Sequence, residues 1–372
     1  MGFAAGIGLE CYGFLQRILI SGWAPVTNLY ETVIWVALIT SVIGLVLEAV
    51  YRKTYAALAA SGMALFATLL AANVPMLDPD ISGLQPVLRS NLWLSIHVLT
   101  IVSSYGAFAL ALALGLVATA DYLAATYRRT ASFGEILSLL LPGLPLLGLG
   151  VATSYASYGH FGASDVIQDY GFYPGMIIGS IGGVLTATSL FAALGEMINR
   201  ALFRDPAAGG DPAMAAAGEE ARTRSMRATA ARIKPMSGFI YRSMQVGVLL
   251  VALGTFLGGW WADVSWGRFW GWDPKEVWAL ITLLVYLIPL HGRFAGWVNT
   301  FGLVMSSVVC FLSVLMAWYG VNHVIGVGLH AYGLTEGGGQ GVVGITTLAV
   351  LSFAAGAAWR RHLSNLKPVE AA

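Results

Sequence analysis

Aromatic and charged side chains alternate in one short stretch of this chain, WGRFWGWDPKEVW, which spans residues 266–278. Of the twelve tryptophans in the sequence, six lie between Trp260 and Trp278. Indole rings offer a flat apolar surface, and the indole N–H group only donates hydrogen bonds. An anchoring belt at a membrane interface, the common alternative, would spread tryptophans over many helix ends. The clustering therefore favours a binding surface for a flat molecule over a belt.

Histidine supplies the other candidate chemistry, because neutral imidazole is a common ligand for metal ions. The strongest candidates are His97, His291 and His330. His97 begins a long apolar segment and His330 lies in a glycine-rich one, whereas His291 lies about four helical turns after Glu276. An ionisable group inside an apolar span is a functional hypothesis by default.

The remaining histidines are His160, His323 and His362. All three are expected at the surface as solvated residues. His323 precedes His330 by about two helical turns and could share its face if that segment is helical. It is therefore the weaker candidate for a ligand.

These side chains must be positioned by membrane helices. Charged residues make up 10% of the chain and hydrophobic residues 57%, against roughly 25% charged residues in soluble domains. Apolar stretches long enough to cross a bilayer lie at 2–20, 31–51, 55–74, 92–122, 135–155, 174–198, 239–260, 276–291, 300–320 and 340–359. We expect an all-α polytopic integral membrane protein with about ten transmembrane helices. The net charge of +1 gives no indication of a nucleic-acid partner.

The basic residues orient these helices. One side of the ten-helix arrangement holds Arg52, Lys53, Arg128, Arg129, Arg293, Arg360, Arg361, Lys367 and the arginine-rich segment 200–242. The exceptions are Arg17, Arg89, Arg268 and Lys275. The positive-inside rule then places both termini in the cytoplasm. The tryptophan stretch, His97 and His330 lie on the external face, and His291 lies within the membrane towards the cytoplasm.

Two histidines from distant segments on the same side as an aromatic surface predict axial coordination of haem. Haem iron takes histidine ligands, and the propionates of haem favour arginine or lysine partners. Among the few outward cations, Arg89 and Arg268 are the candidate partners, together with Lys275.

The helices and their connections predict four regions. Residues 1–129 hold the first four helices with His97, and 130–199 form an extra helix pair with an external loop. Residues 200–238 are rich in Ala, Gly, Pro and Arg and are expected to be a flexible cytoplasmic linker. The last four helices, with the tryptophan stretch, form a core over 239–372.

Several segments resemble one family. WGRFWGWDPKEVWAL is similar to the tryptophan-rich signature of the haem-handling WWD-domain superfamily. The segments APVTNLYET, SNLWLSIHVLTIVSSYGAF, KEVWALITLLVYLIPLH and GVGLHAYG resemble, in family order, those of its CcsA (ResC) branch. These blocks cover about 20–53, 85–110 and 239–335, whereas 130–236 does not match the pattern.

The resemblance implies cytochrome c maturation of the kind carried out by a CcsB–CcsA (ResB–ResC) pair in a bacterial cytoplasmic (inner) membrane. Such proteins export haem b, hold it in an external WWD site and assist its thioether attachment to the CxxCH motif of apocytochrome c, as a cytochrome c synthase. Carried over by motif, His97 and His330 would be the external iron ligands, and His291 a ligand at a membrane-embedded site. The platform for haem would be formed by Trp266, Trp270, Trp272 and Asp273.

The family pattern has a second membrane-embedded histidine, which the CcsB part supplies. No histidine precedes His97 in this sequence. That ligand is therefore expected from a CcsB/ResB-like membrane partner or from a missing N-terminal extension. Apocytochrome c and thiol-reducing proteins are the other implied partners.

Two other functions remain open for the protein, and a second role remains open for Asp273. A CcmC-like haem-binding transporter would load a separate haem chaperone without ligation chemistry, and a membrane scaffold with incidental histidines would bind no chromophore. Asp273, followed by Pro274 and Glu276, also fits a helix N-cap. A capping role for Asp273 does not exclude contact with haem.

Overall fold

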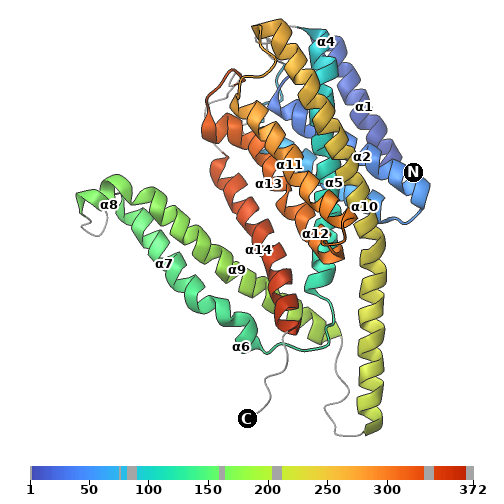
Figure 1. Cartoon of the computed structure of the whole chain (residues 1–372), viewed down its shortest axis with the longest axis vertical. Coiled ribbons are helices and arrows are strands. Elements are labelled where there is room, and N and C mark those ends of the chain that lie inside the picture. The colour runs from blue at the N-terminus through green and yellow to red at the C-terminus, as the bar shows by residue number, and fades with distance from the viewer. Residues whose placement is uncertain are drawn as a thin grey trace. The chain divides into compact units, whose positions relative to one another are not determined.

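The computed structural model describes residues 2–74, 77–81, 90–158, 164–202, 212–330 and 339–365. Over this part of the chain the structure is helical and contains no β-strand (Figure 1). Ten of its helices are long and apolar enough to cross a membrane. The ten predicted helices and the all-α polytopic fold class are therefore confirmed.

The helices follow one another as α1 (Gly2–Ser21), α2 (Leu29–Tyr51), α3 (Tyr55–Asn73), α4 (Asn91–Trp93), the π-helix η2 (Leu94–Val98), α5 (Leu99–Leu123), α6 (Phe133–Ile136), the 3-10 helix η3 (Leu137–Leu139), α7 (Leu140–Ala156), α8 (Asp165–Tyr170), α9 (Phe172–Leu202), α10 (Pro212–Trp266), α11 (Pro274–Phe294), α12 (Thr300–Val309), α13 (Phe311–Leu315), the π-helix η6 (Met316–Ile325) and α14 (Gln340–Asn365). Several continuous spans are built from more than one of these pieces, so that Ser95–Leu123 and Thr300–Ile325 each count as one span.

The chain divides into two compact units. Unit 1 comprises Met1–Val117 and Lys234–Val343, and unit 2 comprises Ala118–Ile233 and Gly344–Ala372. The predicted extra helix pair falls in unit 2, together with the start of α10. Most of α14 also falls in unit 2, although the sequence placed this last helix in the 239–372 core.

Small residues bring the helices of unit 1 close together. Gly247 of α10 lies against the ring of Phe108, and Gly254 lies against the backbone of Ile101, so α5 and α10 approach closely. On the other side of α5, the Thr40 hydroxyl donates to the Gly106 carbonyl over 2.9 Å. Close backbone approach at glycine is the usual basis of helix association in membranes. It places α5, which directly follows the π-helix that carries His97, in contact with α10, which carries Trp261 and Trp266.

Glycine also packs the predicted helix pair of unit 2, in which α7 and α9 run side by side (Figure 1). Gly150 of α7 meets the backbone at Gly179 of α9, and Gly182 meets the backbone at Leu147. Pro145 lies inside α7 without ending it, which membrane helices tolerate when neighbouring groups satisfy the backbone. The helix predicted over 135–155 is thus confirmed despite its prolines.

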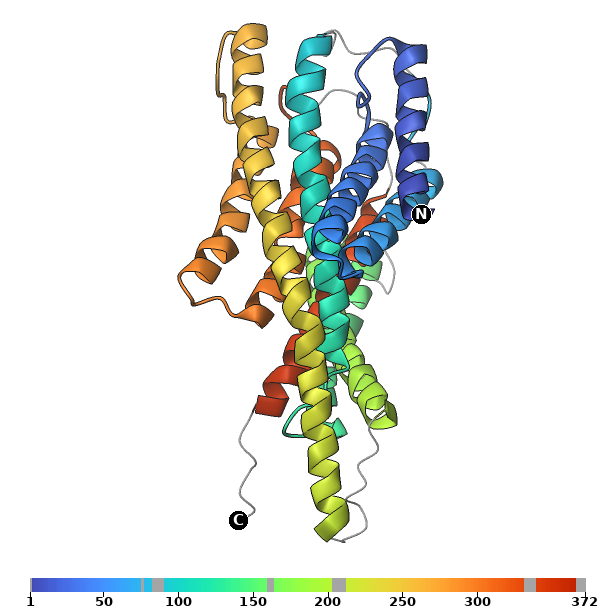
Figure 2. The same cartoon turned by 90° about the vertical axis from the view of Figure 1, so that its right-hand side faces the viewer.

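The structure differs from the prediction over the arginine-rich segment. Residues 212–238, expected to be part of a flexible linker, belong to α10, which Figure 2 shows as one unbroken helix. Alanine, glutamate, arginine and methionine dominate this segment and are strong helix formers. Ser225 and Thr229 are buried one turn apart in unit 2, and Ser225 hydrogen-bonds Thr126 over 2.8 Å. Residues 203–211 of the predicted linker lie outside the described residues.

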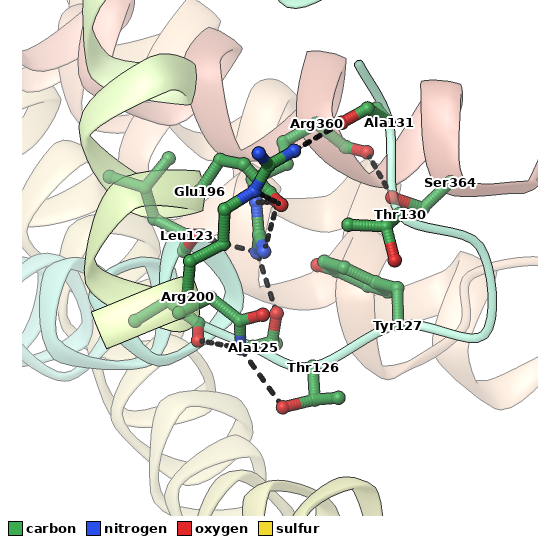
Figure 3. A network of polar contacts seen from close by, with 12 residues as sticks. Leu123, Ala125, Thr126, Tyr127, Thr130, Ala131, Glu196, Arg200, Arg360 and Ser364 are labelled. Atoms are coloured by element: carbon green, nitrogen blue, oxygen red, sulfur yellow. Dashed lines mark hydrogen bonds and ion pairs between the residues drawn. The ribbon is translucent and has the colours of Figure 1, made fainter. Parts of the chain in front are cut away.

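Unit 2 contains a buried ion-pair network around Arg360 (Figure 3). Arg360 is 1% exposed and donates from Nε and Nη2 to Glu196 Oε2 over 3.0 and 2.8 Å. Its Nη1 donates to the carbonyls of Leu123 and Ala125 over 2.8 and 2.6 Å. These carbonyls close the C-terminal end of α5, where backbone acceptors lack helical donors and favour a positive charge. Arg200 donates to the other oxygen of Glu196 over 2.8 Å.

Candidate functional site

All described residues of the candidate site lie in unit 1. The stretch between α10 and α11 ends in a capping box, in which Asp273 accepts from the Lys275 N–H and Glu276 accepts from the Asp273 N–H, each over 3.1 Å. Pro274 occupies the first turn, where its missing N–H leaves no bond unmade. Trp272, which directly precedes Asp273, has φ +58°, a left-handed conformation that is rare for a bulky residue. The capping role considered for Asp273 is therefore present.

The same carboxylate also holds the segment that carries His330. The Nδ1 atom of His330 lies 2.7 Å from Asp273 Oδ1, and the Leu329 N–H donates to Oδ2 of the same carboxylate. Asp273 is buried. One side chain therefore fixes both the start of α11 and the position of a predicted ligand 57 residues away.

The protonation states suit a metal ligand. Burial by itself raises the pKa of the Asp273 carboxyl, but the interaction with His330 and the hydrogen bonds from His330, Lys275 and Leu329 outweigh it and hold the pKa below its usual value. Burial lowers the pKa of His330 below its ordinary range, despite the opposing effect of Asp273. At neutral pH we therefore expect an ionised Asp273 and a neutral His330 whose Nδ1–H donates to it. This tautomer carries the lone pair on Nε2, the arrangement of a carboxylate–histidine–metal triad.

His97 is fixed in a similar way from another helix. It lies in the π-helix η2 at the start of the fourth span, and such irregular helical turns frequently occur at functional sites. Its Nδ1 lies 2.9 Å from the carbonyl oxygen of Gly254 on α10. Because a carbonyl only accepts, Nδ1 carries the proton and Nε2 carries the lone pair.

Gly258, one turn beyond Gly254, lies directly against the His97 ring. A Cβ atom at this position would lie 3.0 Å from Nδ1 and 3.2 Å from Nε2 of His97. We expect Gly258→Ala to displace the imidazole and to weaken the binding of the predicted haem by about 10–100-fold. This is the usual effect of disturbing the support of a metal ligand. Titration of the purified variant with haemin would measure this affinity. Gly62→Ala is the control, because a Cβ atom there meets no atom within 4 Å; equal affinity in both variants would contradict the prediction.

Trp261 contacts both histidines, and the sequence prediction did not include it among the site residues. Its ring is stacked on His97, with centroids 6.1 Å apart and an interplanar angle of 16°. Its centroid also lies 6.0 Å from that of His330 and 4.7 Å from that of Trp266. Trp266 in turn meets His330 edge-on at 5.0 Å. Clustering near Trp260 marked the region, but nothing in the spacing singled out Trp261.

The other predicted platform residues occupy less central places. Trp270 and Trp272 contact each other edge-on at 5.8 Å, and Trp272 is 70% exposed. Arg268, a predicted propionate partner, donates to Glu276 over 3.0 Å and lies over the Trp266 ring. Its charge is therefore already paired. Arg89, the other predicted partner, lies outside the described residues.

His291 lies apart from the other two histidines along α11, about 27 Å from Asp273 at the helical rise. Its side chain is exposed, and its Nδ1 lies 2.9 Å from the Leu287 carbonyl oxygen of the preceding turn. That contact again leaves the lone pair on Nε2. The structure thus groups His97 and His330 at one site and separates His291 from them.

The types of side chain at this site are those that the predicted haem would use. Within the described residues, no group of three or more His, Cys, Asp or Glu side chains could hold a metal ion. A porphyrin brings four nitrogen ligands of its own, so that two imidazoles suffice to complete the coordination of its iron. His97 and His330, each anchored through Nδ1, would supply those two imidazoles.

Comparison with known proteins adds independent information. A family model described as cytochrome C assembly protein matches residues 26–330. The match includes His97, His291 and His330, and it runs through 130–236, where the motif resemblance found no counterpart.

The similar proteins agree with that match. The cytochrome c biogenesis protein CcsA of Parasynechococcus marenigrum is 29% identical over 315 residues, which cover 84% of this chain and 79% of that protein. CcsA of Microcystis aeruginosa is 27% identical over 322 residues, covering 85% and 81%. The protein NrfI of Wolinella succinogenes is 26% identical over 327 residues, covering 87% of this chain but 25% of NrfI. The chain thus spans about a quarter of the length of NrfI and about four fifths of the length of each of these two CcsA proteins. With the family model matching residues 26–330, the chain belongs to the cytochrome c assembly protein family.

Proposed function

We propose that this chain exports haem b across the membrane and presents it in an external WWD site for covalent attachment to apocytochrome c, as the CcsA-type subunit of a cytochrome c synthase. The observation that carries the proposal is the pair His97 and His330. Each imidazole is anchored through Nδ1, and both pack against Trp261. The relatives named CcsA support this reading over a transporter that only loads a chaperone.

In this proposal each residue of the site has a distinct task. His97 and His330 would hold the haem iron through Nε2, and Asp273, by accepting the Nδ1–H of His330, leaves the lone pair of that ring on Nε2. Trp266 packs against His330, while Trp270 and the exposed Trp272 extend an aromatic platform for the macrocycle. Arg268 and Arg89 are the proposed partners of the propionates, with Arg268 sharing its charge between Glu276 and the haem.

The attachment step needs no net oxidant. A cysteine S–H of the CxxCH motif adds across a vinyl group of haem, so that a carbon–sulfur bond forms and the hydrogen goes to the neighbouring carbon. The thiol must be reduced before it reacts, since a disulfide has no S–H to add. This requirement explains the thiol-reducing partners. The proposed task of the chain is to hold haem in place while the apocytochrome approaches.

His291 is proposed to bind haem within the membrane before it reaches the external site. Its exposed side chain on α11 leaves one side of the imidazole open to a second protein. We propose that a CcsB/ResB-like subunit, or a further N-terminal part of the chain, supplies the other ligand. In this arrangement both termini face the cytoplasm of a bacterial cell, and the aromatic site faces outward from the inner membrane.

The optical spectrum of the purified protein tests the proposal. We expect a low-spin haem spectrum with two histidine ligands in the wild type, and its loss in a His97→Ala, His330→Ala double variant. If the wild type is colourless, the same comparison is made on the complex co-expressed with the CcsB-like partner. A low-spin spectrum that survives in the double variant would place haem elsewhere and refute the proposal.

A single change at His291 should separate transport from presentation. We expect His291→Ala to lower the haem content of the external site in cells by about tenfold or more, as expected when a metal ligand is removed, while haem added from outside still binds. Haem content of the purified variant, before and after addition of haem, measures both effects. Unchanged occupancy before addition would remove His291 from the pathway.

A further inference from the structure

We propose that Trp261 is a gate of the external site: its indole occupies the space that the macrocycle needs, and it must move before His97 and His330 can bind the same iron. This inference rests on the proposed function, because it takes the two histidines as ligands of one haem. It goes further in assigning a specific movement to a residue that neither the tryptophan signature nor the predicted platform includes.

The first step is the position of the indole. Trp261 is 4% exposed, and its ring centroid lies 6.1 Å from that of His97 and 6.0 Å from that of His330. The ring is nearly parallel to His97, at 16°, and tilted by 53° to His330. A buried ring at nearly equal distances thus contacts both proposed ligands at once.

The second step is the space that ligation requires. Imidazole nitrogens bind transition metals at about 2 Å, so two axial imidazoles lie close above and below the iron. The flat macrocycle extends sideways between them in every direction. A third ring in contact with both imidazoles would therefore cross the plane of the macrocycle. The arrangement seen here and a haem ligated by both histidines exclude each other.

The third step identifies which ring moves. His97 is held by the Gly254 carbonyl and has Gly258 against its ring, and His330 is held by Asp273. Trp261 contacts its neighbours through ring faces and edges, including Trp266 at 4.7 Å. Anchored imidazoles beside a ring held by packing point to the indole as the mobile member.

The movement should slow the binding of haem. A minor open state of a two-state protein is commonly about 0.1–10% populated, and the apparent association rate is then reduced to that fraction of the rate of the open state. Removing the gate should therefore raise the association rate by about tenfold or more. A platform role for Trp261 predicts a different result, in which dissociation becomes faster and association stays unchanged.

Rapid mixing of haemin with the purified protein tests the gate. We expect Trp261→Ala to bind haemin about tenfold faster or more, and Trp261→Phe, which keeps a smaller ring, to lie between it and the wild type. Trp260→Ala is the matched control, because the neighbouring Trp260 is 53% exposed and contacts Trp93. We expect the control to bind at the wild-type rate. Equal association rates in wild type, Trp261→Ala and Trp261→Phe would overturn the gate.

A second measurement needs no bound haem. Diethyl pyrocarbonate modifies neutral imidazoles, and mass spectrometry of the peptide that contains His97 gives its rate of modification. We expect this rate to rise in both Trp261 variants and to stay unchanged in Trp260→Ala. Unchanged modification in both Trp261 variants would also overturn the gate.

The two experiments separate the gate from the function on which it rests. If the haem spectrum depends on His97 and His330 but the Trp261 variants behave as wild type, the gate is wrong and the proposed function stands. If the spectrum does not depend on the two histidines, the proposed function fails, and the gate fails with it.

Discussion

Replacing either His97 or His330 with alanine is expected to abolish the assembly of covalent cytochrome c while leaving the protein in the membrane. Loss of an outer support of a metal ligand already costs about 10–100-fold in affinity, and loss of the ligand itself should cost at least as much. We expect less than about a tenth of the wild-type level of c-type cytochrome. Haem staining of denatured membrane proteins measures this level, because only covalently bound haem survives denaturation.

His362→Ala is a suitable control for this experiment. His362 is exposed and stacks on Trp359 in unit 2, outside the candidate site. The control should assemble cytochrome c normally, and an immunoblot should show each variant in the membrane at the wild-type amount. Normal cytochrome c levels in both the His97 and the His330 variants would disprove their assignment as external ligands.

Replacing Arg360 with methionine is expected to lower the free energy of unfolding by about 3–5 kcal/mol, the usual effect of removing one partner of a buried ion pair. The change leaves Oε2 of Glu196, which is itself buried, without the two donors of Arg360, and it leaves the carbonyls of Leu123 and Ala125 without those of Nη1. Thermal unfolding in detergent would show this as a large fall in the transition temperature. Arg360→Lys should restore little of the lost stability, since an ammonium group cannot reproduce the planar fork of donors of a guanidinium group.

An exposed ion pair provides the comparison. Arg224 and Glu220 are paired one turn apart with side chains 78% and 75% exposed. Arg224→Met is expected to cost less than about 1 kcal/mol, as is usual for surface pairs. If Arg360→Met and Arg224→Met unfold at the same temperature, the buried network does not stabilise unit 2.

The sequence was sufficient to predict the helices and the proximity of His330 to Trp266. Apolar segments of membrane length can be identified without knowing what they pack against. All ten predicted spans are present in the structure. The prediction failed over 212–238 because it relied on the presence of glycine and proline near the start of that segment. Helix-forming residues further along, and the burial of Ser225 and Thr229, determine its structure instead.

Other features depend on contacts between distant residues and could not be read from local pattern. Arg360 appeared only as one more cytoplasmic charge, because its partner Glu196 is 164 residues away. Trp261 could not be told apart from Trp260 by spacing, since their roles depend on which side of α10 faces His97. The π-helix at His97 likewise has no simple sequence signature, because it reflects the packing of that turn.

Asp273 connects the site to the biosynthesis of the chain. Its carboxylate completes the first turn of α11 and anchors the segment of His330, which is synthesised later than α11. The later histidine therefore meets its anchor only after the earlier helix has begun to form. A newly made copy in which α11 has not yet folded therefore lacks the anchor of His330, although Gly254 of α10 can already hold His97. The proposed pair of ligands is therefore complete only in a copy whose α11 has folded.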